Sequence, residues 1–224
     1  MKDADHPLGD ARSQGQARFF GQVTASVTHE VKNHLALINE YNGLAADLLA
    51  AHARGRPLDL QRLAGLCQEV RRQVREAGEV VGQLNRFAHS VEAAQEEMDL
   101  AELLATFVAI SRRRAQHHRM ELALIPSAAP VRLTTQPFLL LQACSVILEA
   151  ALKDCPEGGR LDICQELAGE RAQVVFCCLP AADTRPELPD WLLAILAAEL
   201  AETPAGGVRL SLPLAGAGAA AAVD

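Results

Sequence analysis

Apolar residues recur at alternating steps of three and four along two long stretches in the first half of the chain. In the first stretch this seam runs from Phe20 to Leu48, with polar Thr24 and His34 at two of its positions; its other members are Val27, Val31, Ile38, Tyr41 and Ala45. In the second stretch the same steps run from Leu63 to Val91 without a gap. Sustained heptad spacing of this kind predicts two long amphipathic helices.

The two helical stretches are separated by Arg54-Gly55-Arg56-Pro57, a turn signal, after which Asp59 can cap the second helix. They predict an antiparallel helical hairpin over residues 16–94. A single hairpin leaves an apolar seam on each helix, so the pattern predicts a homodimer in which two hairpins form a four-helix bundle. An intramolecular partner elsewhere in the chain is the alternative.

From residue 97 to residue 214 the pattern changes to short β-like runs that alternate with helical runs. The strand-like runs are MDL, MELALI, VRLTT, RLDICQEL, AQVVFCCL and GVRLSLPL, and the helical runs cover about residues 101–119, 137–154 and 190–202. The alternation predicts a layered α/β domain after the hairpin, and the whole chain is predicted to be α+β. The polar start (1–15) and the low-complexity end (215–224) predict flexible tails.

Composition limits which kinds of partner the protein can bind and in which compartment we expect it. The 224 residues carry a formal net charge of −7, which argues against nucleic acid, and the basic run from Arg112 to Arg119 is interpreted as the solvated face of a helix. Six cysteines without paired spacing predict reduced thiols. The start does not resemble a signal peptide and no apolar run is long enough to span a bilayer, so we expect a cytoplasmic protein that does not contact a membrane.

The segment ASVTHEVKNHLALI, residues 25–38, combines a histidine with polar neighbours. At about 100° per residue, His29 lies roughly opposite the apolar stripe, and Asn33 lies about 40° from it on the same face. The carboxylate of Glu30 can hold one ring nitrogen and act as a base, which leaves the other nitrogen free to attack phosphorus, and Lys32 adds a positive charge. His34 falls in the seam, where we expect a packed or hydrogen-bonded side chain.

The run FFGQVTASVTHEVKNHLALINEYNGLAADLL resembles the H-box of sensor histidine kinases. That helix typically reads His-Glu-hydrophobic-basic-Asn-Pro-Leu, and His34 replaces the proline here. GQLNRFAHS, near the end of the second helix, resembles the close of the family's hairpin. The resemblance implies that His29 is the phosphorylated residue, that Glu30 is its acid/base partner, and that Asn33 is the residue associated with dephosphorylating receiver domains.

In the second half the chain resembles the kinase ATPase domain but lacks its nucleotide motifs. QACSVILEAALKDCPEGGRLDI, from Gln142, aligns with the family's N-box helix, and the two asparagines that serve Mg-ATP fall on Val146 and Ala150. Neither side chain can coordinate a metal ion. The residues from Leu179 to Asp183 lack the glycines of the adenine loop, and the Gly-rich lid is missing. The resemblance therefore implies a degenerate ATPase-like α/β sandwich that binds no cofactor of its own.

The same resemblance implies a histidine phosphotransferase of a two-component phosphorelay, which exchanges phosphoryl groups between His29 and receiver aspartates and is not an ATP-dependent kinase. The partner would be a response-regulator receiver domain, which supplies Mg²⁺; an upstream hybrid histidine kinase is a further candidate. The alternatives are a receiver phosphatase that acts through Asn33 and a non-catalytic scaffold. We expect the receiver to contact the bundle around His29 through Lys32, Arg75, Glu79, Gln83 and Arg86.

Overall fold

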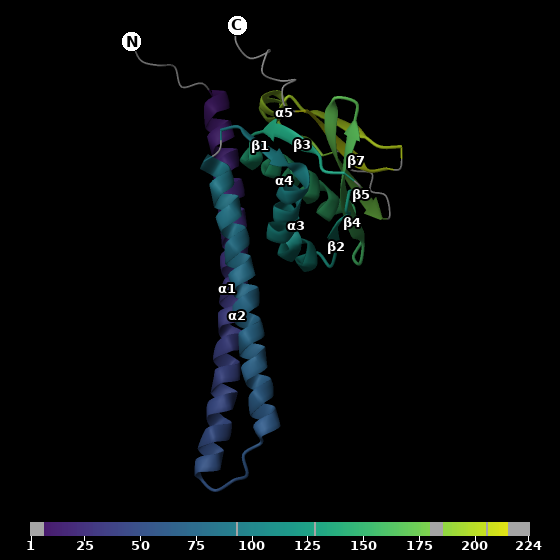
Figure 1. Ribbon diagram of the computed structural model, residues 1–224. Coiled ribbons are helices and arrows are strands. Elements are labelled where there is room, and N and C mark those ends of the chain that lie inside the picture. The colour runs from purple at the N-terminus through teal and green to yellow at the C-terminus, as the bar shows by residue number, and fades with distance from the viewer. Residues whose placement is uncertain (1–6, 93, 128, 180–185, 205, 215–224) are drawn as a thin grey trace, which may run out of the picture.

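A computed structural model describes residues 7–92, 94–127, 129–179, 186–204 and 206–214. A long helical hairpin is followed by a domain with a mixed β-sheet (Figure 1), so the chain is α+β as predicted. The predicted tail at 215–224 and most of the segment that stands in place of the adenine loop, 180–183, lie outside the described residues.

The hairpin consists of α1, Pro7–Ala53, and α2, Leu60–Glu92. Its turn falls on the predicted segment, where Gly55 has a φ of 89°, a value that favours glycine. The predicted cap is present, because Asp59 Oδ1 accepts the backbone N–H of Arg62 at 2.9 Å.

Two contacts set one antiparallel register along the hairpin. The rings of Phe20 and Phe87 stack with centroids 5.6 Å apart, and His34 Nδ1 lies 2.7 Å from Gln73 Oε1. The prediction that His34 is a hydrogen-bonded seam residue is therefore confirmed. Below, "upper hairpin" means the part on the Phe87 side of the His34–Gln73 contact, and "lower hairpin" means the part from that contact to the turn.

The start of α1 differs from the predicted tail at 1–15, because the helix begins at Pro7. The guanidinium of Arg12 lies 5.8 Å from the ring centroid of Trp191, and a Cβ at Gly15 would meet Gln142 Nε2 at 3.4 Å. The first turns of α1 thus extend beyond the hairpin and pack against the second domain. This part of the helix precedes the seam, which begins at Phe20, and it packs against the second domain, so the heptad pattern does not reveal it.

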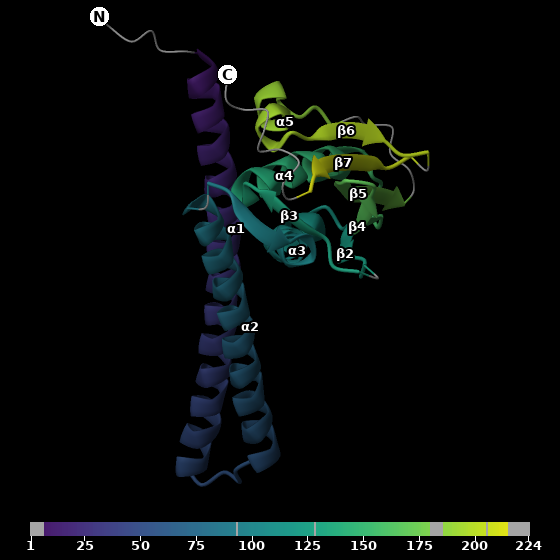
Figure 2. The same cartoon turned by 45° about the horizontal axis from the view of Figure 1, so that its top comes forward.

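The second domain contains two sheets, and the larger one is mixed (Figure 2). Its strand order is β2-β4-β5-β7-β6, with β2 and β4 parallel and the other pairs antiparallel, while β1 and β3 form an antiparallel pair of their own. The strands are β1 Glu96–Asp99, β2 Glu121–Leu124, β3 Arg132–Thr135, β4 Arg160–Ala168, β5 Arg171–Leu179, β6 Glu199–Glu202 and β7 Val208–Pro213.

Two long helices, α3 (Leu100–His117) and α4 (Pro137–Asp154), lie between the hairpin and the larger sheet (Figures 1 and 2). Asp99 caps α3 by accepting the backbone N–H of Ala101 at 2.8 Å. Both helices contact the hairpin, so the hairpin and the domain share one hydrophobic core.

An aromatic cluster forms the centre of that junction. Phe19, Phe87 and Phe138 come from α1, α2 and α4, and their ring centroids lie 5.4 to 5.8 Å apart. Phe87 is completely buried and Phe19 is 4% exposed. The upper hairpin is thereby held against the second domain.

The run predicted as one helix over 190–202 contains two elements. Helix α5 covers Asp190–Leu196, and β6 follows at Glu199–Glu202. Ala197 ends the helix in the left-handed conformation, with a φ of 47°. The Leu- and Ala-rich composition favours a helix throughout, but pairing with β7 at the sheet edge prevails over that preference.

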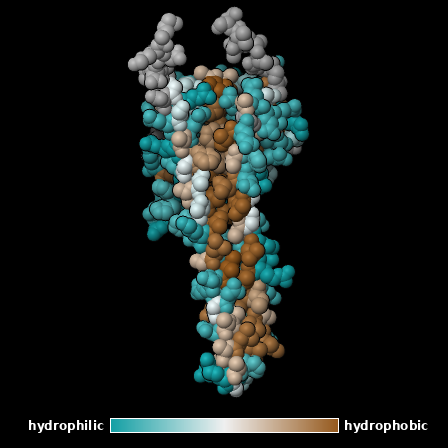
Figure 3. Space-filling model, turned by 90° about the vertical axis from the view of Figure 1, so that its left-hand side faces the viewer, coloured by the Kyte–Doolittle hydropathy of each residue, from teal (hydrophilic) through white to brown (hydrophobic). Residues whose placement is uncertain are grey.

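The hairpin carries an apolar band on a face that the second domain does not cover (Figure 3). On α2, apolar residues seven positions apart are all exposed: Leu60, Cys67, Val74 and Val81. On α1, Leu35 and Leu49 are 55% and 50% exposed. The alternate seam positions of α2, from Leu63 to Leu84, are half-buried against α1. Half of the predicted seam of α2 is therefore without a partner in the described chain.

Within the described ranges, none of the helices is both long and apolar enough to cross a membrane.

Candidate functional site

His29 lies in the middle of α1 with an exposed side chain. Lys32 and Asn33 are exposed as well, and Asn33 follows His29 by one helical turn on the same face. In the described part of the chain the imidazole forms neither a side-chain hydrogen bond nor an ion pair. Both ring nitrogens are therefore open to a partner from outside the chain.

Glu30 points to a different side of the helix from His29, as adjacent helical residues do. It lines a hollow of about 480 Å³ between α1, α2 and α3, together with His34 and Glu76; we call this the lower hollow. The expected hydrogen bond between Glu30 and His29 is absent from the described chain, in which the Glu30 carboxylate has no partner. Glu30 follows His29 directly in the sequence, but its carboxylate is not held against the imidazole ring.

The predicted docking residues do not form one patch. Glu79 and Gln83 line the lower hollow with Glu30, so the fold brings these three together. Arg75 is exposed, and the hairpin register places it at the same level along the hairpin as Lys32. Arg86 lies further along α2, in a separate hollow beside β1, where its Nε donates to Gln83 Oε1 at 3.3 Å.

The basic run at the end of α3 is only partly a solvated face, contrary to the interpretation from sequence. Arg114 Nη1 donates to Glu149 Oε1 at 2.8 Å, and its Nη2 donates to Ser145 Oγ at 2.9 Å. Burial lowers the pKa of Arg114, against the opposite effect of Glu149. A signal was present in the sequence, because Arg114 continues the apolar steps of Leu103, Phe107 and Ile110 on the inner face of α3.

The other basic residues of this run stand beside the helix that carries His29. Arg113, His117 and His118 line a hollow of about 470 Å³ together with Gln22 and Ser26 of α1; we call this the upper hollow. Arg112 lines the lower hollow opposite Glu30. The end of α3 thus flanks the turns of α1 on either side of His29, a juxtaposition that the periodicity of α3 alone did not predict.

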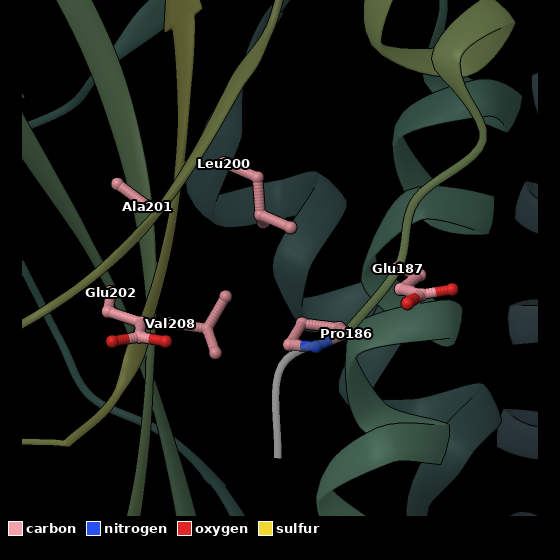
Figure 4. Close-up of a pocket in the computed structure, with 6 residues that line it drawn as sticks. All are labelled: Pro186, Glu187, Leu200, Ala201, Glu202 and Val208. Atoms are coloured by element: carbon pink, nitrogen blue, oxygen red, sulfur yellow. The ribbon is translucent and has the colours of Figure 1, made fainter. Parts of the chain in front are cut away.

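A further hollow, of about 450 Å³, lies in the second domain between the segment before α5 and the edge of the sheet (Figure 4). Leu200, Val208 and Pro186 give it an apolar lining, and Glu187 and Glu202 add two carboxylates. Its described lining contains no basic residue that could neutralise a phosphate group.

The two positions aligned with the Mg-ATP asparagines lie on α4. Val146 packs against the hydrophobic core, and Ala150 is half-buried. Neither offers an oxygen or nitrogen atom from its side chain. Within the described ranges, His, Cys, Asp and Glu side chains form no group that could hold a metal ion.

The cysteines differ in part from the prediction of reduced thiols. Cys67, Cys144, Cys164 and Cys177 are free, whereas Cys155 is disulfide-bonded. Burial raises the pKa of Cys144 to about 12 and, together with the neighbouring Cys177, that of Cys164 to about 11. Thiols with a raised pKa are largely protonated near neutral pH, so Cys144 and Cys164 are poor nucleophiles.

No protein-family model matches the chain, and no curated protein matches its sequence. Similar solved structures include the catalytic domain of histidine kinase ThkA, at 14% identity over 55% of this chain and 97% of that one, with a TM-score of 0.44. A histidine kinase from Burkholderia phymatum aligns at 18% identity over 88% and 98% of the two chains, with a TM-score of 0.42. ThkA in complex with response regulator protein TrrA aligns at 12% identity over 95% and 67%, with a TM-score of 0.41. These similarities transfer no residue roles to this chain.

Proposed function

We propose that this protein is a histidine phosphotransferase of a two-component phosphorelay, which accepts a phosphoryl group on His29 from one receiver domain and passes it to another. The observation that carries the proposal is the exposed imidazole of His29 in mid-helix, without a partner in the described chain, inside a run that resembles the histidine-kinase H-box. An exposed imidazole on a long, regular helix is accessible to the active site of another protein.

The transfer step requires one nucleophile from this chain. A ring nitrogen of His29 attacks the phosphorus of the receiver's phospho-aspartate; the N–P bond forms as the aspartyl O–P bond breaks, and aspartate leaves as a carboxylate. The other ring nitrogen releases its proton to a base, and we propose Glu30 for this role after its side chain turns from the lower hollow toward the ring, since its carboxylate has no competing partner in the described part of the chain. Mg²⁺ held by the receiver neutralises charge on the phosphoryl oxygens. The reverse sequence delivers the group to a second receiver.

We further propose that the second domain supplies no ATP chemistry. Transfer from ATP depends on positioning the metal ion and the phosphates. Val146 and Ala150 provide no ligands where the family has asparagines.

The apolar stripe on the hairpin supports a homodimer as the working form. Its members are exposed on a face opposite the second domain, and two copies packed along this stripe would make a four-helix bundle. The exposed seam positions of α2 recur every seven residues, which is the spacing such a bundle requires.

The test is a phosphotransfer assay with a radiolabelled phospho-receiver and no ATP. We expect acid-labile label on the wild-type chain and none on His29→Ala. His52→Ala is the matched control, because His52 is an exposed histidine near the far end of the same helix. Label that persists on His29→Ala, or appears only when ATP is present, would contradict the proposal.

A second candidate function, dephosphorylation of a receiver, is favoured by Asn33. Its exposed amide shares a helical face with His29 and has no partner in the described chain, so it could orient a water molecule toward a phospho-aspartate. Loss of phosphate from the receiver to solvent, abolished by Asn33→Ala but retained by His29→Ala, would identify this activity. Transfer to His29 should survive Asn33→Ala.

A further inference from the structure

The end of α3 presents a cluster of basic side chains on a chain whose formal net charge is −7. Two arginines of the run are neutralised, Arg114 by Glu149 and Arg119 by Glu157 at 2.7 Å. The other basic side chains form no ion pair or side-chain hydrogen bond within the described residues; they are Arg112, Arg113, His117 and His118. We call these four residues the α3 basic end.

The α3 basic end stands at both sides of the phosphoacceptor turn. The upper hollow joins Arg113, His117 and His118 to Ser26, which precedes His29 by one helical turn. The lower hollow joins Arg112 to Glu30, the residue after His29, and to Glu76 and Glu79 of α2, so the excess of positive charge lies at the upper hollow. The turn of α1 that carries His29 therefore runs between two hollows to which α3 contributes basic side chains.

Arg114 and its partners hold this end of α3 in place. The bond to Ser145 and the ion pair with Glu149 tie α3 to α4, and buried Val23 and Val27 place α1 beside α3. A charge fixed on a packed helix is oriented before a partner arrives, so less side-chain and backbone freedom is lost on binding than with a loop.

We propose that the α3 basic end is a docking element for the acidic rim of the receiver active site that meets His29. This inference rests on the proposed phosphotransfer. The receiver pocket carries the acceptor aspartate and the carboxylates that bind Mg²⁺, so its rim is negative. An acidic chain would repel such a surface at long range, and local positive charge beside His29 counteracts that repulsion and speeds encounter. The second domain then contributes partner binding.

The experiment measures single-turnover transfer from a phospho-receiver to the full-length chain over a range of receiver concentrations, at low and high salt. The test variant is Arg112→Gln/Arg113→Gln, and the matched control is Arg54→Gln/Arg56→Gln, two exposed arginines in the hairpin turn. We expect the half-saturating receiver concentration to rise about tenfold in the test variant at low salt and to approach the wild-type value at high salt. The control and the rate at saturation should change less than about twofold.

Two further measurements separate docking from chemistry. Direct phosphorylation of His29 by phosphoramidate, a small donor that needs no docking surface, should be equal in all variants. Arg112→Lys/Arg113→Lys keeps the charge and should retain most of the affinity for the receiver. A test variant whose half-saturation and salt dependence equal those of the control overturns the docking proposal and leaves the phosphotransferase proposal intact. A wild-type chain that takes no label from any receiver overturns the proposed function itself.

Discussion

The upper and lower hairpin share one heptad pattern but differ in what covers it. In the upper hairpin Phe19, Val23, Val27 and Phe87 are buried because α3 and α4 pack against them. From residue 28 to residue 86, a range that contains the whole lower hairpin and the adjoining part of the upper hairpin, the only buried residue is Gln73, whose Oε1 bonds His34. The same sequence pattern thus serves two purposes. One end of the hairpin is stabilised by its own chain, and the other end is left open to a second copy.

The largest effect should come from the covered end. Phe87→Ala removes a completely buried ring at the meeting point of three helices and should lower the free energy of unfolding by about 3–5 kcal/mol. Urea denaturation at fixed protein concentration measures this. Leu167→Ala, at an exposed position of β4, is the control and should change it by about 0.5 kcal/mol or less. Equal losses in both variants would mean that the junction does not stabilise the fold.

The exposed seam of α2 is tested by placing a charge next to Gln73, where the lower hairpin begins. Val74→Asp places a carboxylate at a position that is 54% exposed in one chain but buried in the proposed bundle. Because symmetry introduces two carboxylates per interface, we expect the dimer dissociation constant to rise about 100-fold or more, as measured by sedimentation velocity. Leu167→Asp should leave the association unchanged. A wild-type chain that remains monomeric at tens of micromolar would contradict this part of the proposal.

Alkaline pH tests the buried core of the second domain through the thiol of Cys144, because the folded protein keeps this thiol neutral. The pKa of Cys144, raised to about 12 by burial, lies above that of an unfolded thiol at about 8.5. The contribution of the neutral thiol is complete below about pH 8.5 and is lost as the pH rises toward about 12. Between pH 7.5 and 10 the wild type should lose about 1–2 kcal/mol more stability than Cys144→Val, by urea denaturation at both pH values. An equal loss in the two proteins would show that this thiol does not contribute.

The smallest effect is expected in the lower hairpin. A Cβ at Gly43 would meet no atom within 4 Å, and the residue lies inside α1. Gly43→Ala should therefore raise the thermal unfolding midpoint, with a gain of about 0.5–1 kcal/mol from helix propensity alone. Unchanged association in sedimentation would confirm that this face of α1 stays in solvent. A lower midpoint would mean that Gly43 contacts a second copy.

The sequence predicted the elements whose signal is periodic or local. The two long helices follow from heptads, and the turn and cap follow from Gly55, Pro57 and Asp59. Three features were missed because they depend on contacts between distant segments: the helical start of α1 on Trp191, strand β6 at the sheet edge, and Arg114 inside α3. Local preference misleads where tertiary packing decides.

In the candidate site, too, the features that follow from local helical geometry were predicted, and those that depend on distant segments were not. That His29 and Asn33 share an exposed face follows from helical geometry and is confirmed by the structure. The predicted hydrogen bond between His29 and Glu30 is absent among the described residues, since adjacent residues on a helix diverge and the neighbours of Glu30 in the lower hollow include residues of α2 and α3. The roles of these residues in phosphoryl transfer remain predictions.

The chain contains a single tryptophan, and its position gives the junction an optical signal. Trp191 is half-buried, packs against the shared core and has the guanidinium of Arg12 over its ring. Its fluorescence reports on one place, the contact between the first turns of α1 and α5, and is insensitive to the distant hairpin turn. Emission during denaturation would therefore follow separation of the two parts of the chain, while circular dichroism at the helical wavelengths follows melting of the hairpin.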